Sequence, residues 1–220
     1  MANDLLLRIV SASITGAFTI WIIIDGGFWL YVEIALCIVG LLGEWYKINR
    51  NKRRAGLFVG GIIYILSPML FWLWAAIYHQ EAMIRAILWI LSIVCSCDIF
   101  AFFGGRLLGG AKFAPTISPN KTWSGVIVGS IGALISSTCY LFFRRIEISG
   151  ILGLASILII IAAILGDLIE SKVKRVLMIK DTGSIIPGHG GMCDRLDSFL
   201  LASYAFIILD YSWKMGLIFG

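Results

Sequence analysis

The residues best suited to chemistry gather between Asp167 and Asp197. This stretch carries ten of the chain's charged residues, five acidic and five basic. Carboxylate and phosphate oxygens are the ligands that Mg²⁺ prefers, and Lys and Arg side chains bind polyphosphates. The mixture of acids and cations therefore indicates a site for a phosphorylated substrate with a metal ion, rather than a generally basic surface.

The first part of this stretch has the spacing of a helix that continues an apolar run. The polar residues at positions i, i+3, i+4, i+7 and i+8 are Asp167, Glu170, Ser171, Lys174 and Arg175. At 3.6 residues per turn they share one face. Such a face is also typical of a salt-bridged helix end in water. Asp167, however, lies within a turn or two of the apolar run, where ionisable groups are costly and usually functional.

The second part is a glycine-rich loop that leads into another apolar run. Four glycines between residues 183 and 191 allow backbone amides to approach an anion closely. Asp194 and Asp197, three residues apart, begin the next helix. A single histidine is most often structural, but the flexible loop brings His189 beside charged groups, so we include it as a candidate.

A second polar stretch precedes the fifth apolar run. Asp98 lies six residues inside the end of the fourth run, and Ser118 and Thr122 are candidate N-caps of the helix that follows. A helix N-terminus with Lys121 beside it is also a favourable site for an anion. Capping and anion binding are compatible, so both interpretations stay open.

Apolar helices must position these two stretches. Of the 220 residues 60% are hydrophobic and 14% charged, and the mean hydropathy is +0.94, whereas average chains are about 45–50% apolar and about 25% charged. This composition excludes a water-soluble domain, a disordered chain and a nucleic-acid-binding protein. Continuous runs of about 20 apolar residues indicate membrane-spanning helices rather than a barrel. Seven such runs are present, at residues 5–24, 28–46, 55–78, 82–104, 123–143, 150–169 and 196–219.

We therefore expect an all-α, multi-pass membrane protein with about seven transmembrane helices, within a range of six to nine because Ser67-Pro68 could divide the third run. It would form one integral domain, with N-terminal spans in 1–97, the motifs and central spans in 98–197, and a last span in 196–219. Fourteen of the 18 basic residues fall on one side. The positive-inside rule then places both polar stretches in the cytoplasm, at the cell's inner membrane. Gly60-Gly61 and Gly125-x-x-x-Gly129 permit close helix packing and favour a homodimer.

Taken in order, the polar residues form a family pattern. Residues 171–197 read S-x2-K-R-x4-K-D-x-G-x3-P-x-H-G-G-x2-D-R-x-D, which resembles the signature of the CDP-diacylglycerol synthase family, also called phosphatidate cytidylyltransferases. The segments D-x-x-A-x-x-G at 98–104 and S-P-x-K-T-W at 118–123 are similar to the family's second motif. The family would have Glu or Gln at position 124, where this chain has Ser124. The chain looks like a short, bacterial-type member.

The resemblance implies transfer of CMP from CTP to phosphatidic acid, which gives CDP-diacylglycerol and pyrophosphate in phospholipid biosynthesis. It implies Mg²⁺ held by Asp167 and Asp194, with Asp98 as a further candidate, and a second cation such as K⁺. The residues that it implicates in catalysis are Lys174, Arg175, Lys180, Asp181, His189, Arg195 and Asp197. The residues expected to bind substrate are Ser118, Lys121, Thr122, Ser171, Gly190 and Gly191.

Two other functions fit part of the pattern. A CTP-dependent polyprenol or dolichol kinase would transfer the γ-phosphate of the same nucleotide, but the H-G-G-x2-D-R-x-D motif argues against it. An ion-coupled transporter would explain Asp98 and Asp167 as intramembrane acids. It would not explain two charged, glycine-containing segments.

Overall fold

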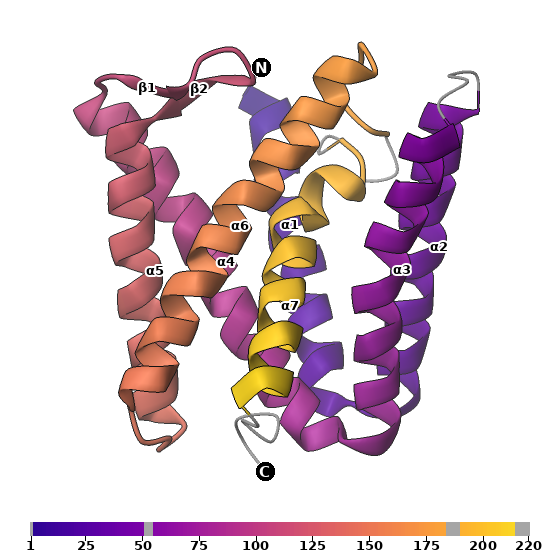
Figure 1. Cartoon of the computed structure of the whole chain (residues 1–220), viewed down its shortest axis with the longest axis vertical. Helices are drawn as coiled ribbons and strands as arrows, with labels where there is room; N and C mark the ends of the chain where they lie inside the picture. Colours follow the sequence, from indigo (N-terminus) through magenta and orange to yellow (C-terminus); the bar gives the residue numbers. More distant parts are fainter. Residues whose placement is uncertain (1, 51–54, 184–189, 214–220) are drawn as a thin grey trace. The chain divides into compact units, whose positions relative to one another are not determined.

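The computed structural model describes residues 2–50, 55–183 and 190–213, with side chains from residue 14 onward. Within these ranges the chain forms seven helices and one two-stranded hairpin (Figure 1). The elements in chain order are α1 (Ala2–Asp25), α2 (Gly27–Asn49), α3 (Ala55–Tyr78), α4 (Gln80–Leu108), β1 (Lys112–Ala114), β2 (Ser118–Thr122), α5 (Trp123–Phe143), α6 (Gly150–Val176) and α7 (Cys193–Trp213).

The expected all-α, multi-pass membrane architecture is confirmed. Among the described residues, five helices (α2 to α6) are long and apolar enough to cross a membrane, and Ile14–Asp25 of α1 is a shorter apolar helix. α3 and α5 have the bounds expected from the sequence, and α3 continues through Pro68 as one helix. α4 and α6 extend past the expected ends of their apolar runs, so that charged residues continue both helices beyond the apolar zone.

The chain divides into two compact units. The first comprises Met1–Ile84 and Leu177–Leu196, and therefore holds the glycine-rich loop. The second comprises Arg85–Val176 and Asp197–Gly220, and holds Asp98, the hairpin and the polar face of α6. The polar stretch from Asp167 to Asp197 is thus divided: the glycine-rich loop belongs to the first unit, and the polar face of α6 belongs to the second. The expectation of one integral domain stays a prediction.

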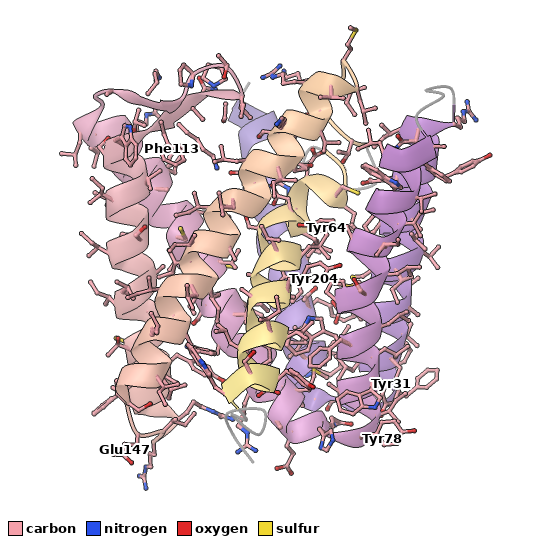
Figure 2. The ribbon with its side chains drawn as sticks, in the orientation of Figure 1. Tyr31, Tyr64, Tyr78, Phe113, Glu147 and Tyr204 are labelled. Carbon is pink, nitrogen blue, oxygen red and sulfur yellow. The ribbon has the colours of Figure 1, made fainter. Side chains whose placement is uncertain are left out.

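In the first unit, α2 packs along α3. Gly61 leaves room for the indole of Trp45, whose Nε1 donates a hydrogen bond to the carbonyl oxygen of Phe58 at 2.9 Å. At the other end of α2, the hydroxyl of Tyr31 donates to the carbonyl oxygen of Ala76 at 3.3 Å (Figure 2). These contacts fix the position of α2 along α3, and with it the level of the side chains near the end of α2.

In the second unit, the hairpin leads directly into α5 (Figure 1). Its strands are antiparallel, with Lys112 paired to Thr122. The ring of Phe113, labelled in Figure 2, packs edge-on against the ring of Trp123, with 4.7 Å between the ring centroids. The sequence did not predict these strands. They set the direction in which the chain enters α5, and so the placement of the residues just before it.

Glycines allow α5 to approach α4 closely. A Cβ added at Gly125 or Gly129 would lie 2.8 Å from the carbonyl oxygen of Ala101 or Cys97, respectively. Real Cβ atoms do not tolerate such a distance, so these positions require glycine for packing inside the chain. Because Gly125 and Gly129 are used in this way, as is Gly61 against Trp45, they give no support to the homodimer that their spacing suggested.

Candidate active site

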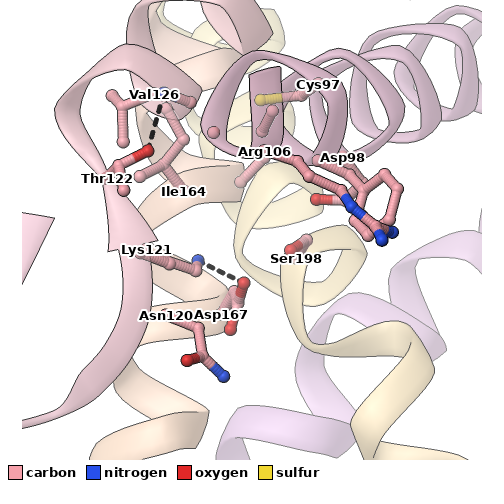
Figure 3. Close-up of a pocket in the computed structure, with 15 residues that line it drawn as sticks. Cys97, Asp98, Arg106, Asn120, Lys121, Thr122, Val126, Ile164, Asp167 and Ser198 are labelled. Atoms are coloured by element: carbon pink, nitrogen blue, oxygen red, sulfur yellow. Dashed lines mark hydrogen bonds and ion pairs between the residues drawn. The ribbon is translucent and has the colours of Figure 1, made fainter. Parts of the chain in front are cut away.

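A pocket of about 470 Å³ lies in the second unit (Figure 3). Its charged and polar lining comes from four elements and includes Asp98 and Arg106 of α4, Lys121 of β2, Asp167 of α6 and Ser198 of α7. Part of the wall is apolar, with Phe102, Val126 and Ile164. Opposite charges beside an apolar wall suit a ligand that has both an anionic group and a lipid-soluble part.

Lys121 and Asp167 form an ion pair inside this pocket (Figure 3). Their side chains are 25% and 30% exposed. The hydroxyl of Ser171, one turn further along α6, donates to Oδ1 of Asp167 at 3.3 Å. The structure therefore brings together three residues to which the sequence assigned separate roles in metal and substrate binding.

The hairpin ends in the expected helix cap. The amide of Gly125 donates to the Thr122 hydroxyl at 3.1 Å, so Thr122 is the N-cap of α5. The hydroxyl of Ser124 donates to the carbonyl oxygen of Gly109 and lies 3.0 Å from that of Thr122. Ser124, where the family would have Glu or Gln, thus connects the start of α5 to the backbone just after α4. The expectation that Ser118 caps the same helix is wrong, because Ser118 begins β2, four residues before the cap.

The predicted polar face of α6 exists, and part of it is internally paired. Lys174 Nζ lies 2.7 Å from Glu170 Oε2, one turn away. Arg175 Nε donates to the carbonyl oxygen of Ile117 at 3.4 Å, which connects α6 to the hairpin turn. Both cations lie on the helix that carries Asp167 towards the pocket. The ion pair is the salt-bridged helix end that the spacing also allowed.

Asp197 adds a third acid to this region of the second unit. The negative charges of Asp167 and Asp98 act on its carboxylate, and the positive charge of Lys174 opposes them. α7 comes this close to α6 because Gly166 has no side chain: a Cβ there would lie 2.6 Å from the Asp197 carbonyl oxygen. Three carboxylates within electrostatic reach of one another favour the binding of a cation nearby.

In the first unit, Asp194 organises the glycine-rich loop. Its Oδ2 accepts three hydrogen bonds: from the amide of Thr182 at 2.9 Å, from the Thr182 hydroxyl at 2.9 Å, and from the amide of Gly191 at 2.8 Å. Thr182 is buried, with 7% of its surface exposed. The sequence assigned Asp194 to a metal site, and the structure shows in addition that this carboxylate joins the two ends of the loop.

The same loop is held by an acid from α2. Glu44 is 2% exposed, and its carboxylate accepts hydrogen bonds from the amides of Met192 and Cys193, both at 2.9 Å. Its Oε2 also lies 3.3 Å from the Thr182 hydroxyl. Two carboxylates, from helices far apart in the sequence, therefore converge on one short stretch of backbone at the start of α7.

The remaining candidates of this unit are three charged residues and two glycines. The charged side chains among them are exposed: Lys180, Asp181 and Arg195. Gly190 has a backbone φ of +82°, a conformation that favours glycine, and Gly191 is buried against Thr182. His189 lies outside the described residues. The loop region therefore combines two carboxylates that are fixed by backbone amides with two cations whose side chains are exposed.

The donor chemistry of the second-unit pocket fits a magnesium ion. Within the described residues, no three His, Cys, Asp or Glu side chains are grouped closely enough to hold a metal by themselves. Asp98 and Asp167 do line the same pocket. Two carboxylates with phosphate oxygens and waters form the kind of oxygen ligand set in which Mg²⁺ is usually bound.

The sequence of this chain is similar to that of a known protein family. The sequence pattern of the cytidylyltransferase family matches residues 54–212, which include every polar segment described above. The chain belongs to the cytidylyltransferase family.

Curated relatives extend this match beyond the family pattern. The phosphatidate cytidylyltransferase of Rickettsia bellii is 37% identical over 213 residues, which cover 91% of this chain and 88% of the relative. That of Rickettsia typhi is 34% identical, with 93% and 91% covered. The phosphatidate cytidylyltransferase of Helicobacter pylori is 44% identical over 140 residues, 61% of this chain and 51% of the relative. The chain is thus nearly as long as its rickettsial relatives and resembles them well before Asp98.

Three residues of this cytidylyltransferase had no role in the sequence-based prediction: Arg106 of the pocket, Thr182 and Glu44. Thr182 lies inside the recognised signature but had no assigned role, because its buried hydroxyl is defined only by the folded loop. Glu44 lies in an apolar run, among residues assigned to a membrane span. An acid at such a position is costly in lipid and usually has a partner. That rule could have drawn attention to Glu44, although the identity of its partners required the structure.

Proposed function

We propose that this cytidylyltransferase transfers CMP from CTP to phosphatidic acid. A phosphate oxygen of the lipid forms a bond to the α-phosphorus of CTP, and the bond from that phosphorus to the bridging oxygen of the β-phosphate breaks. The products are CDP-diacylglycerol and pyrophosphate. Relatives that cover nearly the whole chain bear the name phosphatidate cytidylyltransferase, and the reaction explains why charged groups and an apolar wall line one pocket.

The observation that carries the proposal is the pocket with Asp98, Arg106, Lys121 and Asp167 beside apolar side chains. Both reactants are anions, so their approach requires positive charge and alignment more than removal of a proton. A phosphate nucleophile is already ionised at neutral pH. Arg106 and Lys121 supply positive charge at the pocket, and the apolar wall accepts the glycerolipid part of the acceptor.

The residues of α6 and of the loop complete the charge arrangement. In this proposal four cations bind the triphosphate and the lipid phosphate: Lys174, Arg175, Lys180 and Arg195. Phosphate oxygens are also contacted by three hydroxyl groups and two stretches of backbone, those of Ser118, Thr122 and Ser171 and those at Gly190 and Gly191. Asp181, His189 and Asp197 orient these groups, His189 as a hydrogen-bond donor rather than a general base.

We propose Mg²⁺ as the cofactor, held by Asp167 and Asp194, with Asp98 as a further ligand and a second cation such as K⁺ nearby. When bound, the ion neutralises phosphate charge and polarises the bond to the leaving pyrophosphate. Asp98 and Asp167 share a pocket, which supports their part in this set. Lys121 pairs with Asp167, and we propose that it exchanges this partner for a substrate phosphate on binding.

The sidedness and the assembly are also proposals. We infer a multi-pass protein of the bacterial inner membrane with its active site facing the cytoplasm, because most basic residues fall on the side of the polar stretches. We also propose a homodimer. Its support is a pair of glycines four residues apart on α3, Gly56 and Gly60. A Cβ added at either glycine would have no atom of another described part of the chain within 4 Å, so this side of α3 is open. Such a pair permits close helix contact.

The direct test uses the purified protein in detergent with phosphatidic acid, labelled CTP and Mg²⁺. The expected products are labelled CDP-diacylglycerol and one pyrophosphate per lipid converted. A lipid kinase would instead release CDP and phosphorylate the acceptor. Absence of both products, together with ion flux in vesicles containing the protein, would contradict the transferase proposal.

A further inference from the structure

We propose that Glu44 is a positioning residue of the active site, which holds the glycine-rich loop in the geometry required for cytidylyl transfer. The proposal rests on the proposed function, since the loop is taken to serve that reaction. It concerns a residue of α2, far from the signature in the sequence. Glu44 would act through Asp194 and the backbone of the loop, without touching substrate itself.

The hydrogen bonds of Glu44 define what it holds. Oε1 accepts from the amide of Met192 and Oε2 from that of Cys193, both at 2.9 Å. These amides lie at the start of α7, where the first N–H groups of a helix have no acceptor within the helix. Asp194 follows directly. A carboxylate fixed on these two amides therefore fixes the backbone on which Asp194 is carried.

The loop is built to admit this carboxylate. A Cβ at Gly183 would collide with Oε1 of Glu44, and one at Gly191 would lie 2.6 Å from Oε2. Both glycines belong to the signature segment. Their lack of side chains thus serves the approach of Glu44 at least as directly as it could serve the approach of an anionic substrate. The glycines, the two amides and the acid form one packing unit.

Helix capping alone does not account for Glu44. Asp194, in the first turn of α7, already accepts from the Gly191 amide and from both donors of Thr182, and a local acid is the usual cap. Glu44 comes from a helix 148 residues earlier than Met192. It also reaches the Thr182 hydroxyl, on the other side of the loop, at 3.3 Å. Glu44 of α2 therefore contacts both described ends of the loop, by hydrogen bonds at Met192 and Cys193 and by packing at Thr182 and Gly183.

The test compares Glu44→Gln and Glu44→Asp with wild type. In Glu44→Gln the side chain keeps its size, but an NH₂ group faces a backbone N–H, so one of the two bonds is lost. We expect kcat to fall about 10-fold to 100-fold, with the KM for phosphatidic acid within about twofold of wild type. Glu44→Asp keeps the charge on a shorter side chain, and we expect its kcat to be at least about threefold higher than that of Glu44→Gln.

Hydrogen exchange measured by mass spectrometry gives a readout independent of activity. In Glu44→Gln, peptides covering residues 182–193 should exchange at least about tenfold faster, whereas peptides from α3 should keep wild-type rates. The matched control is Asn49→Ala, which removes another buried polar side chain of α2. The amide of Asn49 donates to the carbonyl oxygen of Trp45, one turn back in the same helix. This control should keep both kcat and the exchange of the loop.

Three results would overturn the proposal. The first is a kcat for Glu44→Gln within twofold of wild type with unchanged loop exchange. The second is faster exchange throughout α2, α3 and the loop in both Glu44 variants, which would mark a general structural role. The third is an equal loss in Asn49→Ala. If wild type itself makes no CDP-diacylglycerol, the proposed function fails, and the exchange data still decide whether Glu44 holds the loop.

Discussion

The hydroxyl of Thr182 offers a sharp test of how Asp194 is oriented. Thr182→Val replaces the hydroxyl by a methyl group of similar size. The Thr182 amide and the Gly191 amide still donate to Oδ2 of Asp194, so one of three hydrogen bonds is removed. The site is buried, and solvent is therefore a poor replacement for the lost donor.

The size of the effect follows from the chemistry of that bond. A hydrogen bond to a charged group contributes about 1.5–3 kcal/mol, and about 1.4 kcal/mol corresponds to a factor of ten in rate. If the orientation of Asp194 matters fully in the transition state, kcat/KM should fall about 10-fold to 150-fold. The Thr182 hydroxyl has a single proton, and 2.9 Å to Asp194 against 3.3 Å to Glu44 favours donation to Asp194.

The assay measures labelled CDP-diacylglycerol formed from CTP in mixed micelles at several concentrations of phosphatidic acid. Thr182→Ser, which keeps the hydroxyl, is the matched control and should stay within about threefold of wild type. A Thr182→Val enzyme with wild-type kcat/KM and unchanged thermal stability would refute the reasoning. Asp194 would then not depend on this donor during turnover.

Further predictions concern the acids, the metal and the packing of α5. Asp167→Asn and Asp194→Asn should each abolish turnover without reducing the amount of protein in the membrane fraction; near-wild-type rates in both would remove them from the metal site. Chelation with EDTA should stop product formation, and added Mg²⁺ should restore it. Lys121→Met should raise the KM for CTP or phosphatidic acid at least about tenfold, and Lys121→Arg should raise it less. Gly129→Val should lower the melting temperature measured in detergent, because its side chain would meet the backbone of α4.

The apolar helices were predictable because burial in lipid requires long uninterrupted runs, and runs of this kind mark helices directly. The bounds of α3 and α5 were accordingly found from the sequence. The end of α4 was not, since this helix continues through Arg106 after the apolar run stops. The continuation of α6 through Arg175 was predicted from the helical spacing of its polar residues. The hairpin escaped notice because its strands are three and five residues long and contain Pro119 and Asn120, which are uncommon in strands.

The candidate site was predictable where residues act together locally. The i, i+4 spacing on α6 anticipated the contact of Ser171 with Asp167, and Thr122 has the side chain of an N-cap. The pairing of Lys121 with Asp167 depends on how the hairpin folds beside α6, which no local pattern encodes. Glu44 is the clearest limit: its contacts join residues almost 150 positions apart, and the order of residues alone does not reveal such a meeting.

The separation between Glu44 and its amides also has a consequence for biogenesis. During synthesis α2 is made long before Met192 and Cys193 leave the ribosome, so the buried carboxylate has none of its loop donors while α3 to α6 are being inserted. The active-site loop can reach its final form only near the end of translation. A fragment that begins at residue 54, where the family pattern starts, would lack Glu44 altogether. Such a fragment would carry every signature residue and still lack the acceptor for two amides of its own loop.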